Sequence, residues 1–357
     1  MTQGGHMSNL KKYFPMIREK EDVLADINEN PRLSSIFRSW TLEQQKEFLD
    51  ICTGTKGMKI LSDSVFKEVN NPEYTPHRMN DFLSSIYGQN VRILKMLPND
   101  SVRIASEGTL LITDLVVELE DGSIVNVEVQ RIGYKFPGER AACYSADLLL
   151  RQYKRVRDQQ GKRFVYKDIK PVHTIVLFEK SPQEFKQFPE HYIHYVEQKS
   201  DTGLQLNLLQ KYVFICLDNY NQKAHNEPIK DELEAWLTFF STDEPEMIER
   251  LISAYPKFKE MYETIYEMCL NTEKVMEMFS KELQILDKNT VQYMIDEMQV
   301  VIDKQQGKID EQQGKIDEQQ GKIDEQQGTI HEQQETIQEK DRLITQLKEQ
   351  LSKMSGI

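Results

Sequence analysis

The sequence predicts an α/β (α+β) core with a mixed β-sheet, followed by a helical segment and a C-terminal coiled coil. Three patterns predict this: two alternating runs joined by a short turn, continuous apolar runs suited to buried strands, and a strict seven-residue repeat near the C-terminus. The expected divisions are an N-terminal helical segment (1–58), the core (59–222), a helical segment (223–300) and a heptad-repeat coiled coil (301–357).

A β-hairpin is expected in the middle of the chain. Residues 110–120 and 124–132 are rich in β-branched side chains and alternate between polar and apolar, and Asp121-Gly122-Ser123 between them is typical of a turn. Val125, Val127 and Val129 share one face of the second strand, and Asn126, Glu128 and Gln130 share the other. The hairpin therefore has an apolar face and a polar face.

Helices and further strands complete the expected core. A helix of about 15 residues should open at Pro137 and Gly138 and end near Tyr153. Runs 172–178 and 212–217 are continuously apolar, as in buried strands, whereas 189–195 is interpreted as a loop. Earlier helices are expected over 31–60, with a start near Thr41, and over 80–87, where Gly88 ends the helix.

The C-terminal repeat is the most regular feature of the chain. Isoleucine recurs every seven residues from Ile302 to Ile344, and Leu351 continues the series. Such a period predicts a left-handed coiled coil with these residues at the a position. Glutamine fills the d position from Gln305 to Gln333, so half of the seam is polar. We expect this tail to pair two copies of the chain; a partly disordered repeat is the alternative.

Composition excludes several classes of protein. The apolar runs are too short for a membrane span, no signal peptide is evident, and four scattered cysteines match no zinc spacing, so a reduced cytoplasmic protein is expected. The net charge of −13 belongs entirely to 221–357, which has 16 basic and 29 acidic residues. Residues 131–170 have 11 basic and 4 acidic residues, a net of +7, which permits contact with nucleic-acid phosphates.

The polar face of the hairpin suggests a metal site. A three-residue loop would pair Val116 with Glu128 and Asp114 with Gln130, which places both carboxylates on one face within about 5–8 Å of each other. Paired carboxylates repel unless a cation lies between them, and their oxygens suit Mg²⁺ or Mn²⁺. A solvent-facing acidic surface is the alternative interpretation.

These residues resemble a known family. Asp114, followed after thirteen residues by Glu128-Val129-Gln130, resembles the PD-(D/E)XK motif in its Glu-x-Gln form. Arg140 and Tyr144 resemble the Arg-x-x-x-Tyr helix that follows the motif, and 170–175 resembles the next strand. The ordered set is similar to Rpn-type recombination-promoting nucleases, the PD-(D/E)XK nuclease family transposases, over about 60–220.

The resemblance implies a restriction-endonuclease-like core that cleaves DNA with Mg²⁺. Asp114 and Glu128 would be the metal ligands, and Gln130 stands where most of the superfamily has lysine. A neutral amide can donate a hydrogen bond but cannot neutralise developing charge. Asp81 is the candidate for the upstream acidic residue of the superfamily, and Asp63 is the second candidate.

The expected function is therefore a cytoplasmic, metal-dependent DNA endonuclease that promotes recombination or transposition-like events. The alternatives are a nuclease-like DNA-binding module without efficient catalysis, oligomerised by its coiled coil, and a structural coiled-coil protein. The residues expected to contact DNA lie on or directly after the helix that opens at Pro137: Arg140, Tyr144, Arg151, Lys154, Arg155 and Arg157.

Overall fold

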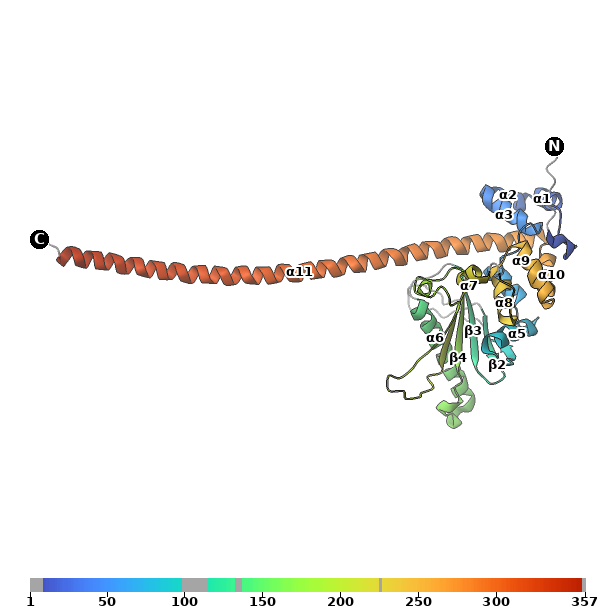
Figure 1. The fold of residues 1–357 in the computed structure, drawn as a ribbon, viewed down its shortest axis with the longest axis horizontal. Helices are drawn as coiled ribbons and strands as arrows, with labels where there is room; N and C mark the ends of the chain where they lie inside the picture. Colours follow the sequence, from blue (N-terminus) through green and yellow to red (C-terminus); the bar gives the residue numbers. More distant parts are fainter. Residues whose placement is uncertain (1–8, 98–114, 132–136, 225–226, 355–357) are drawn as a thin grey trace. The chain divides into compact units, whose positions relative to one another are not determined.

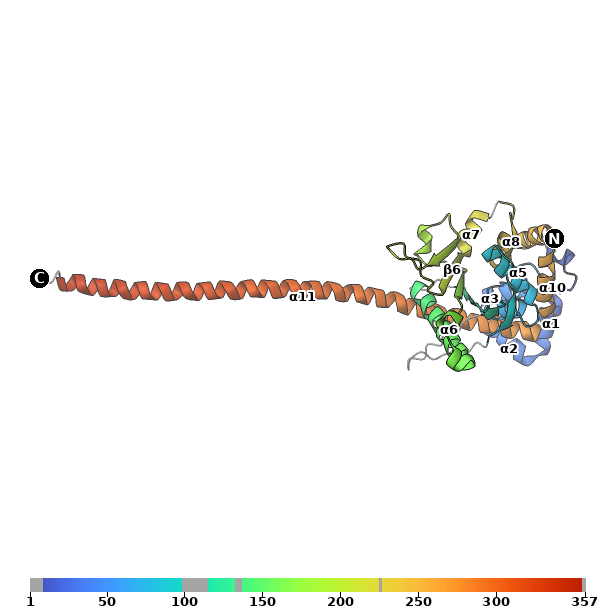
Figure 2. The same ribbon diagram turned by 90° about the horizontal axis from the view of Figure 1, so that it is seen from below.

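The computed structural model describes residues 9–97, 115–131, 137–224 and 227–354. The chain forms two compact units, Met1–Tyr293 and Met294–Ile357. Figures 1 and 2 show the first unit as a sheet with helices on both faces, and the second as one long helix.

A mixed sheet organises the first unit, as the sequence predicts, and it has six strands in the described residues. Its strands are β1 (Ile93–Met96), β2 (Leu115–Leu119), β3 (Ile124–Gln130), β4 (Val172–Phe178), β5 (Ile193–Glu197) and β6 (Gln210–Cys216), in the order β1-β2-β3-β4-β6-β5. The pairs β3–β4 and β4–β6 are parallel, whereas β1–β2, β2–β3 and β5–β6 are antiparallel. The carboxyl ends of the three parallel strands therefore lie at one edge.

The hairpin keeps the predicted faces but not the predicted register. Leu115 pairs with Val127 and Val116 with Asn126, so the expected pairing of Val116 with Glu128 is wrong by two residues. The reason is a turn that lies one residue earlier: Leu119 is opposite Ser123, so the three-residue loop is 120–122 and not 121–123. The Leu119 N–H donates to the Ser123 carbonyl oxygen, and the Gly122 N–H donates to that of Leu119. The paired numbers still sum to an even total, which keeps the apolar sets together.

One face of the sheet joins the main hydrophobic core. Leu115, Val117, Val125, Val127 and Ile175 point into this core, together with apolar residues of the N-terminal and C-terminal helices. Those helices are α1 (Lys20–Glu29), α2 (Pro31–Ser39), α3 (Leu42–Cys52), α4 (Asp63–Val69), α5 (Pro76–Tyr87), α7 (Leu217–Ala224), α8 (Glu232–Ser241), α9 (Pro245–Ala254) and α10 (Lys257–Met268), and the start of α11 (Thr272–Met354). The helices before and after the sheet thus share one core with it.

The opposite face is covered by α6 (Pro137–Gln160), which is longer than the predicted fifteen residues. Ala141 packs with Val176, Phe178, Phe214 and Cys216 at one end of the strands. Leu148 packs with Val116, Ile124 and Val172 at the other end. Because α6 lies along the strands from end to end, it buries whatever side chains β3 and β4 place between these two clusters.

Local signals placed several element ends correctly. Thr41 caps α3 in a capping box with Gln44, and Gly88 ends α5 in the left-handed conformation at φ 64°. Two edge strands were missed, β1 and β5, and β5 falls where a loop was predicted. Both are short, and most of their residues are exposed, so hydrophobic patterning did not reveal them.

The predicted boundary at residue 300 does not interrupt the helix. α11 runs from Thr272 to Met354 through the four glycines of the repeat. Val275 and Met276 near its start are buried in the main core, whereas the described side chains of 301–351 are all exposed. The tail is therefore helical throughout its described length, which differs from the alternative of a partly disordered repeat.

No helix within the described ranges combines the length and the apolarity needed to cross a membrane. The four cysteines are free thiols: Cys52, Cys216 and Cys269 are buried and Cys143 is exposed.

The stability of the folded chain should depend on the protonation of His173 in β4. Burial, together with the charge of Lys211, lowers the pKa of His173 to about 4. An unfolded chain keeps a histidine pKa of about 6.5, so only the unfolded state takes up this proton between these values, and stability falls as the pH drops. Between pH 7.5 and pH 5 the loss from this residue should be about 2 kcal/mol.

Chemical denaturation at the two pH values measures this loss. The variant His173→Gln should lose about 2 kcal/mol less than the native sequence over the same interval, because its side chain does not titrate. Equal losses for both proteins would show that His173 does not carry the effect.

Candidate active site

The polar side chains of β3 lie under α6 and are buried. Glu128 is 3 % exposed and Gln130 7 %, while Asn126 and its neighbour on β4, Thr174, are fully buried. The interpretation of this face as a solvent-facing acidic surface is therefore wrong. Burial of polar groups costs free energy, and a carboxylate is the most costly of them, so this strip needs compensating partners.

Glu128 and Gln130 contact each other directly. The Gln130 amide nitrogen donates a hydrogen bond to the Glu128 carboxylate. The amide oxygen of Gln130 is buried and has no hydrogen-bond partner among the described residues. The strand end therefore presents a carboxylate and an unpaired amide oxygen, two hard oxygen donors of the kind that Mg²⁺ and Mn²⁺ bind. These residues fit a divalent cation.

Asp114 lies outside the described residues. In the sequence it directly precedes Leu115, whose partner Val127 directly precedes Glu128. In the described part of the chain, no cluster of three or more histidine, cysteine, aspartate or glutamate side chains suits a metal ion. Of the two predicted metal ligands, Glu128 is thus the one that lies within the described residues.

Arg140 and Tyr144 lie on the first turns of α6, after the chain leaves the end of β3. Tyr144 is 3 % exposed, so it packs inside the molecule instead of facing solvent. The half-buried Arg140 donates a hydrogen bond to the Tyr144 hydroxyl at 2.9 Å, and its guanidinium carbon lies 5.7 Å from the centre of the Tyr144 ring. Tyr144 therefore orients Arg140, which remains partly accessible.

The other predicted DNA contacts divide into two groups. Arg151 pairs with Asp147 at 2.8 Å, and Arg155 pairs with Glu118 at 3.0 Å. Lys154 and Arg157 are exposed, and neither pairs with a carboxylate in the ranges that the structure describes. Arg157 instead contacts the ring and hydroxyl of Tyr153.

These exposed cations lie far from Arg140 along α6. Fourteen residues separate Arg140 from Lys154, which corresponds to about 21 Å of helix. Gln152 accepts a hydrogen bond from the backbone of Lys170, just before β4 begins, so this part of α6 lies at the amino ends of the strands. The +7 segment therefore covers the full length of the sheet, from the Glu128 end to the opposite end.

The two candidates for the upstream acidic residue lie in different surroundings. Asp81 is on α5, which packs into the main core, and it pairs with Lys257 of α10 at 3.0 Å. The structure does not bring it together with Glu128. Asp63 begins α4, pairs with Lys67 at 2.5 Å, and donates its backbone N–H to Glu282 at 3.1 Å. Glu282 in turn pairs with Arg131, the residue directly after Gln130.

Arg131 is a residue of this region that sequence patterns did not single out. Its side chain is 10 % exposed, and it pairs with Glu282 of α11 and, at 2.5 Å, with Glu179. The Glu179 N–H also donates to the Gln130 carbonyl oxygen at 2.9 Å. Arg131 thus ties the end of β3 to the end of β4 and to α11. An arginine next to the motif was the only sequence signal, because its partners are 48 and 151 residues away.

An apolar pocket lies beside this ionic cluster. Met58, Val275, Phe279 and Leu286 line it, together with Arg131. The pocket lies between α3, α4 and α11.

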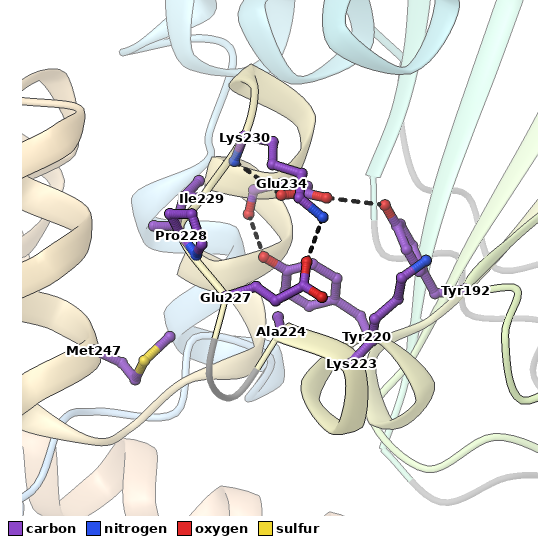
Figure 3. Close-up of a pocket in the computed structure, with 10 residues that line it drawn as sticks. All are labelled: Tyr192, Tyr220, Lys223, Ala224, Glu227, Pro228, Ile229, Lys230, Glu234 and Met247. Carbon is purple, nitrogen blue, oxygen red and sulfur yellow. Dashed lines mark hydrogen bonds and ion pairs between the residues drawn. The ribbon is translucent and has the colours of Figure 1, made fainter.

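A second pocket, shown in Figure 3, lies between β5, α7 and α8. Its polar groups bond to one another: the Tyr192 hydroxyl donates to the Glu234 carboxylate at 3.3 Å, and the Tyr220 hydroxyl donates to the Glu234 carbonyl oxygen at 2.9 Å. Burial, with nearby carboxylates, raises the pKa of Tyr192 to about 12. This pocket lies where the edge of the sheet meets the helices. Its lining residues, as described, do not offer an unpaired oxygen atom like that of Gln130 at the end of β3.

A family model for the PD-(D/E)XK nuclease family transposases matches residues 60–296, about two thirds of the chain. The chain belongs to this family. The matched range contains the whole sheet, α6 and the start of α11. No curated protein and no solved structure matched the chain.

Replacement of Arg131 should destabilise the fold strongly. Arg131→Met would leave Glu179 and Glu282 partly buried without their cation, which costs about 3–5 kcal/mol for a buried pair. The free energy of unfolding, measured in denaturant, checks this value. Arg157→Met removes an exposed arginine and should change stability by less than about 0.5 kcal/mol. A loss for Arg131→Met no larger than for Arg157→Met would contradict the bridging role.

Proposed function

We propose that this chain is a divalent-metal-dependent DNA endonuclease, acting in the cytoplasm, that promotes recombination or transposition-like events. Family membership supports a nuclease-type hydrolase. The observation that carries the proposal is the buried pair of Glu128 and Gln130 at the end of β3, which unites a carboxylate with an unpaired amide oxygen. A carboxylate removed from water binds a cation more strongly than an exposed one, because the dielectric screening is weaker.

Asp114 and Glu128 would hold Mg²⁺ or Mn²⁺. When bound, such an ion polarises the scissile phosphate and lowers the pKa of a coordinated water. Gln130 keeps the Glu128 carboxylate in place through its amide nitrogen and offers its oxygen to the ion or to water. Being neutral, it stabilises charge on the phosphate only by hydrogen bonding, so positive charge would have to come from a predicted DNA contact such as Arg140.

The DNA contacts would be distributed along α6. Arg140, oriented by Tyr144, would bind a phosphate close to the scissile one. Lys154 and Arg157, with Lys162 and Arg163, would contact the backbone further away. Arg151 and Arg155 can contribute positive charge, although each already pairs with a carboxylate.

Asp63 is the better candidate for the upstream acidic residue. Its backbone is linked through Glu282 to Arg131 and so to the end of β3, whereas Asp81 pairs with Lys257 among the helices on the other face. Self-association through 301–357 would bring two nuclease units into one molecule, which suits cleavage of both DNA strands.

Nicking of supercoiled plasmid tests the proposal. The native chain should cut with Mg²⁺ or Mn²⁺ and stop when EDTA removes the ion. Glu128→Gln keeps the shape of the side chain but removes its charge, and it should reduce the rate at least about a hundredfold, since metal stabilisation of the transition state amounts to several kcal/mol. Asp114→Asn should have the same effect.

Glu184→Gln is the matched control, because it removes one exposed carboxylate elsewhere and should leave the rate unchanged. If the native chain binds DNA but no divalent metal supports cleavage, the endonuclease is excluded and the DNA-binding module remains. The neutral Gln130 is compatible with weak or absent cleavage. The basic helix α6 then favours DNA binding over an inert scaffold.

Binding to duplex DNA should depend on the basic end of α6. Changing Lys154, Arg157, Lys162 and Arg163 to glutamine should weaken binding at every sequence. It should also make the slope of log K against log salt less negative by roughly one for each DNA phosphate that the variant no longer neutralises. Fluorescence anisotropy across a salt series measures both quantities.

An equal change of charge elsewhere serves as the control. Glutamine at the exposed positions Lys20, Lys46, Lys186 and Lys199 should leave the salt slope nearly unaltered. Identical slopes for the two quadruple variants would mean that net charge alone, and not α6, attracts DNA.

A further inference from the structure

The a-position isoleucines of α11 form an exposed apolar stripe. From Ile302 to Ile344 they are 46–58 % exposed. We propose that the occupant of this stripe is a second copy of the chain, paired as a parallel, in-register, two-stranded coiled coil. The inference rests on the proposed self-association of the tail and assigns its orientation, register and number of strands.

The hydrogen bonds of the repeat point to parallel strands. Each e-position glutamine at Gln306, Gln313 and Gln320 donates to the aspartate four residues later at 2.8 Å. The preceding d-position glutamines, Gln305 and Gln312, make no side-chain hydrogen bond within the described helix. Their amides remain available at the seam.

Parallel pairing uses these amides. It places isoleucine against isoleucine and glutamine against glutamine, so that paired amides donate to and accept from each other. Antiparallel pairing would set each d-position glutamine against an isoleucine, and a buried polar group without a partner costs about 1–3 kcal/mol. Five glutamine layers, at Gln305, Gln312, Gln319, Gln326 and Gln333, make this difference large.

The flanking charges favour the same orientation. Lys308, Lys315 and Lys322 occupy the g position. In a parallel pair each lies beside an e-position glutamine of the partner, as Lys308 beside Gln313, whereas in an antiparallel pair lysine would meet lysine. Lys315 and Lys322 already pair with glutamates four residues earlier at 2.6 Å, so no interhelical ion pair is needed to hold them.

Apolar layers at the two ends of the tail define the register. Ile295, Met298 and Ile302 form an apolar a/d set before the repeat, and Ile344, Leu347 and Leu351 form one after it; all six are exposed. Within the repeat a shift of seven residues preserves every layer. At the ends, the same shift would place Met298 opposite Gln305 and Leu347 opposite Lys340. Each apolar side chain would then face a polar one, so less apolar surface would be buried at both sites. At the C-terminal end, isoleucine at a (Ile344) is combined with leucine at d (Leu347), the combination that favours two strands.

Cysteine cross-linking of the full chain tests the arrangement. In a Cys143→Ser background, which removes the exposed native thiol, Gln305→Cys and Lys340→Cys are each oxidised under mild conditions. Both d positions should cross-link to themselves and give at least roughly tenfold more covalent dimer than Gly321→Cys at the outward f position. Light scattering before oxidation should report two chains for every variant.

Other outcomes would overturn separate parts of the proposal. A dimer in which neither d position links to itself excludes the parallel in-register arrangement. Links between Gln305→Cys and Gln312→Cys chains in a mixture, without self-links, indicate a register shifted by one heptad. Three chains exclude the two-stranded form. A monomer in light scattering would show that the tail does not self-associate. Plasmid nicking by the same protein tests the nuclease proposal independently of this result.

Discussion

The alternation of side chains along β3 is the constraint on which the rest of the first unit depends. Val125 and Val127 enter the main core, so Asn126, Glu128 and Gln130 must point to the other face. A register slip of one residue would exchange these sets, burying a carboxylate among aliphatic side chains. The apolar core thereby fixes where the polar strip lies, and α6 closes over it.

The end of this strand is held by charge as well as by packing. Arg131 joins Glu179, next to β4, and Glu282, on α11. The Glu282 carboxylate also accepts a hydrogen bond from the backbone N–H of Asp63, the first residue of α4. Arg131, directly after Gln130, is therefore attached to a helix far away in the sequence, so the position of Glu128 depends on the N-terminal and C-terminal helices together.

Charge is divided between the middle and the C-terminal part of the chain in a way that total composition hides. The acidic residues of the repeat are placed outside the seam, where glutamates pair with lysines of the same helix and aspartates accept from glutamines. The basic residues of α6 lie on a helix that covers the sheet. An acidic chain can thus present a basic surface to DNA, because screening confines each charge to a range of about 8–10 Å.

The sequence by itself determined the features that depend on neighbours along the chain. Alternation defined β3, apolar runs defined β4 and β6, Thr41 and Gly88 defined helix ends, and the motif of Glu128 identified the family. Short edge strands escaped because β1 and β5 are largely exposed and carry little hydrophobic signal.

Tertiary structure alone decided the hairpin register, the burial of the polar strip and the partners of Arg131. The register followed from a three-residue turn that begins at Glu120, one residue earlier than expected. Burial of Glu128 followed from the placement of α6, and the separation of Asp81 from Glu128 followed from the packing of α5 against the opposite face. The burial of the strip and the ion pairs of Arg131 are contacts between residues distant in sequence. Local periodicity cannot encode them, because it reports only which face a side chain occupies and not what covers that face.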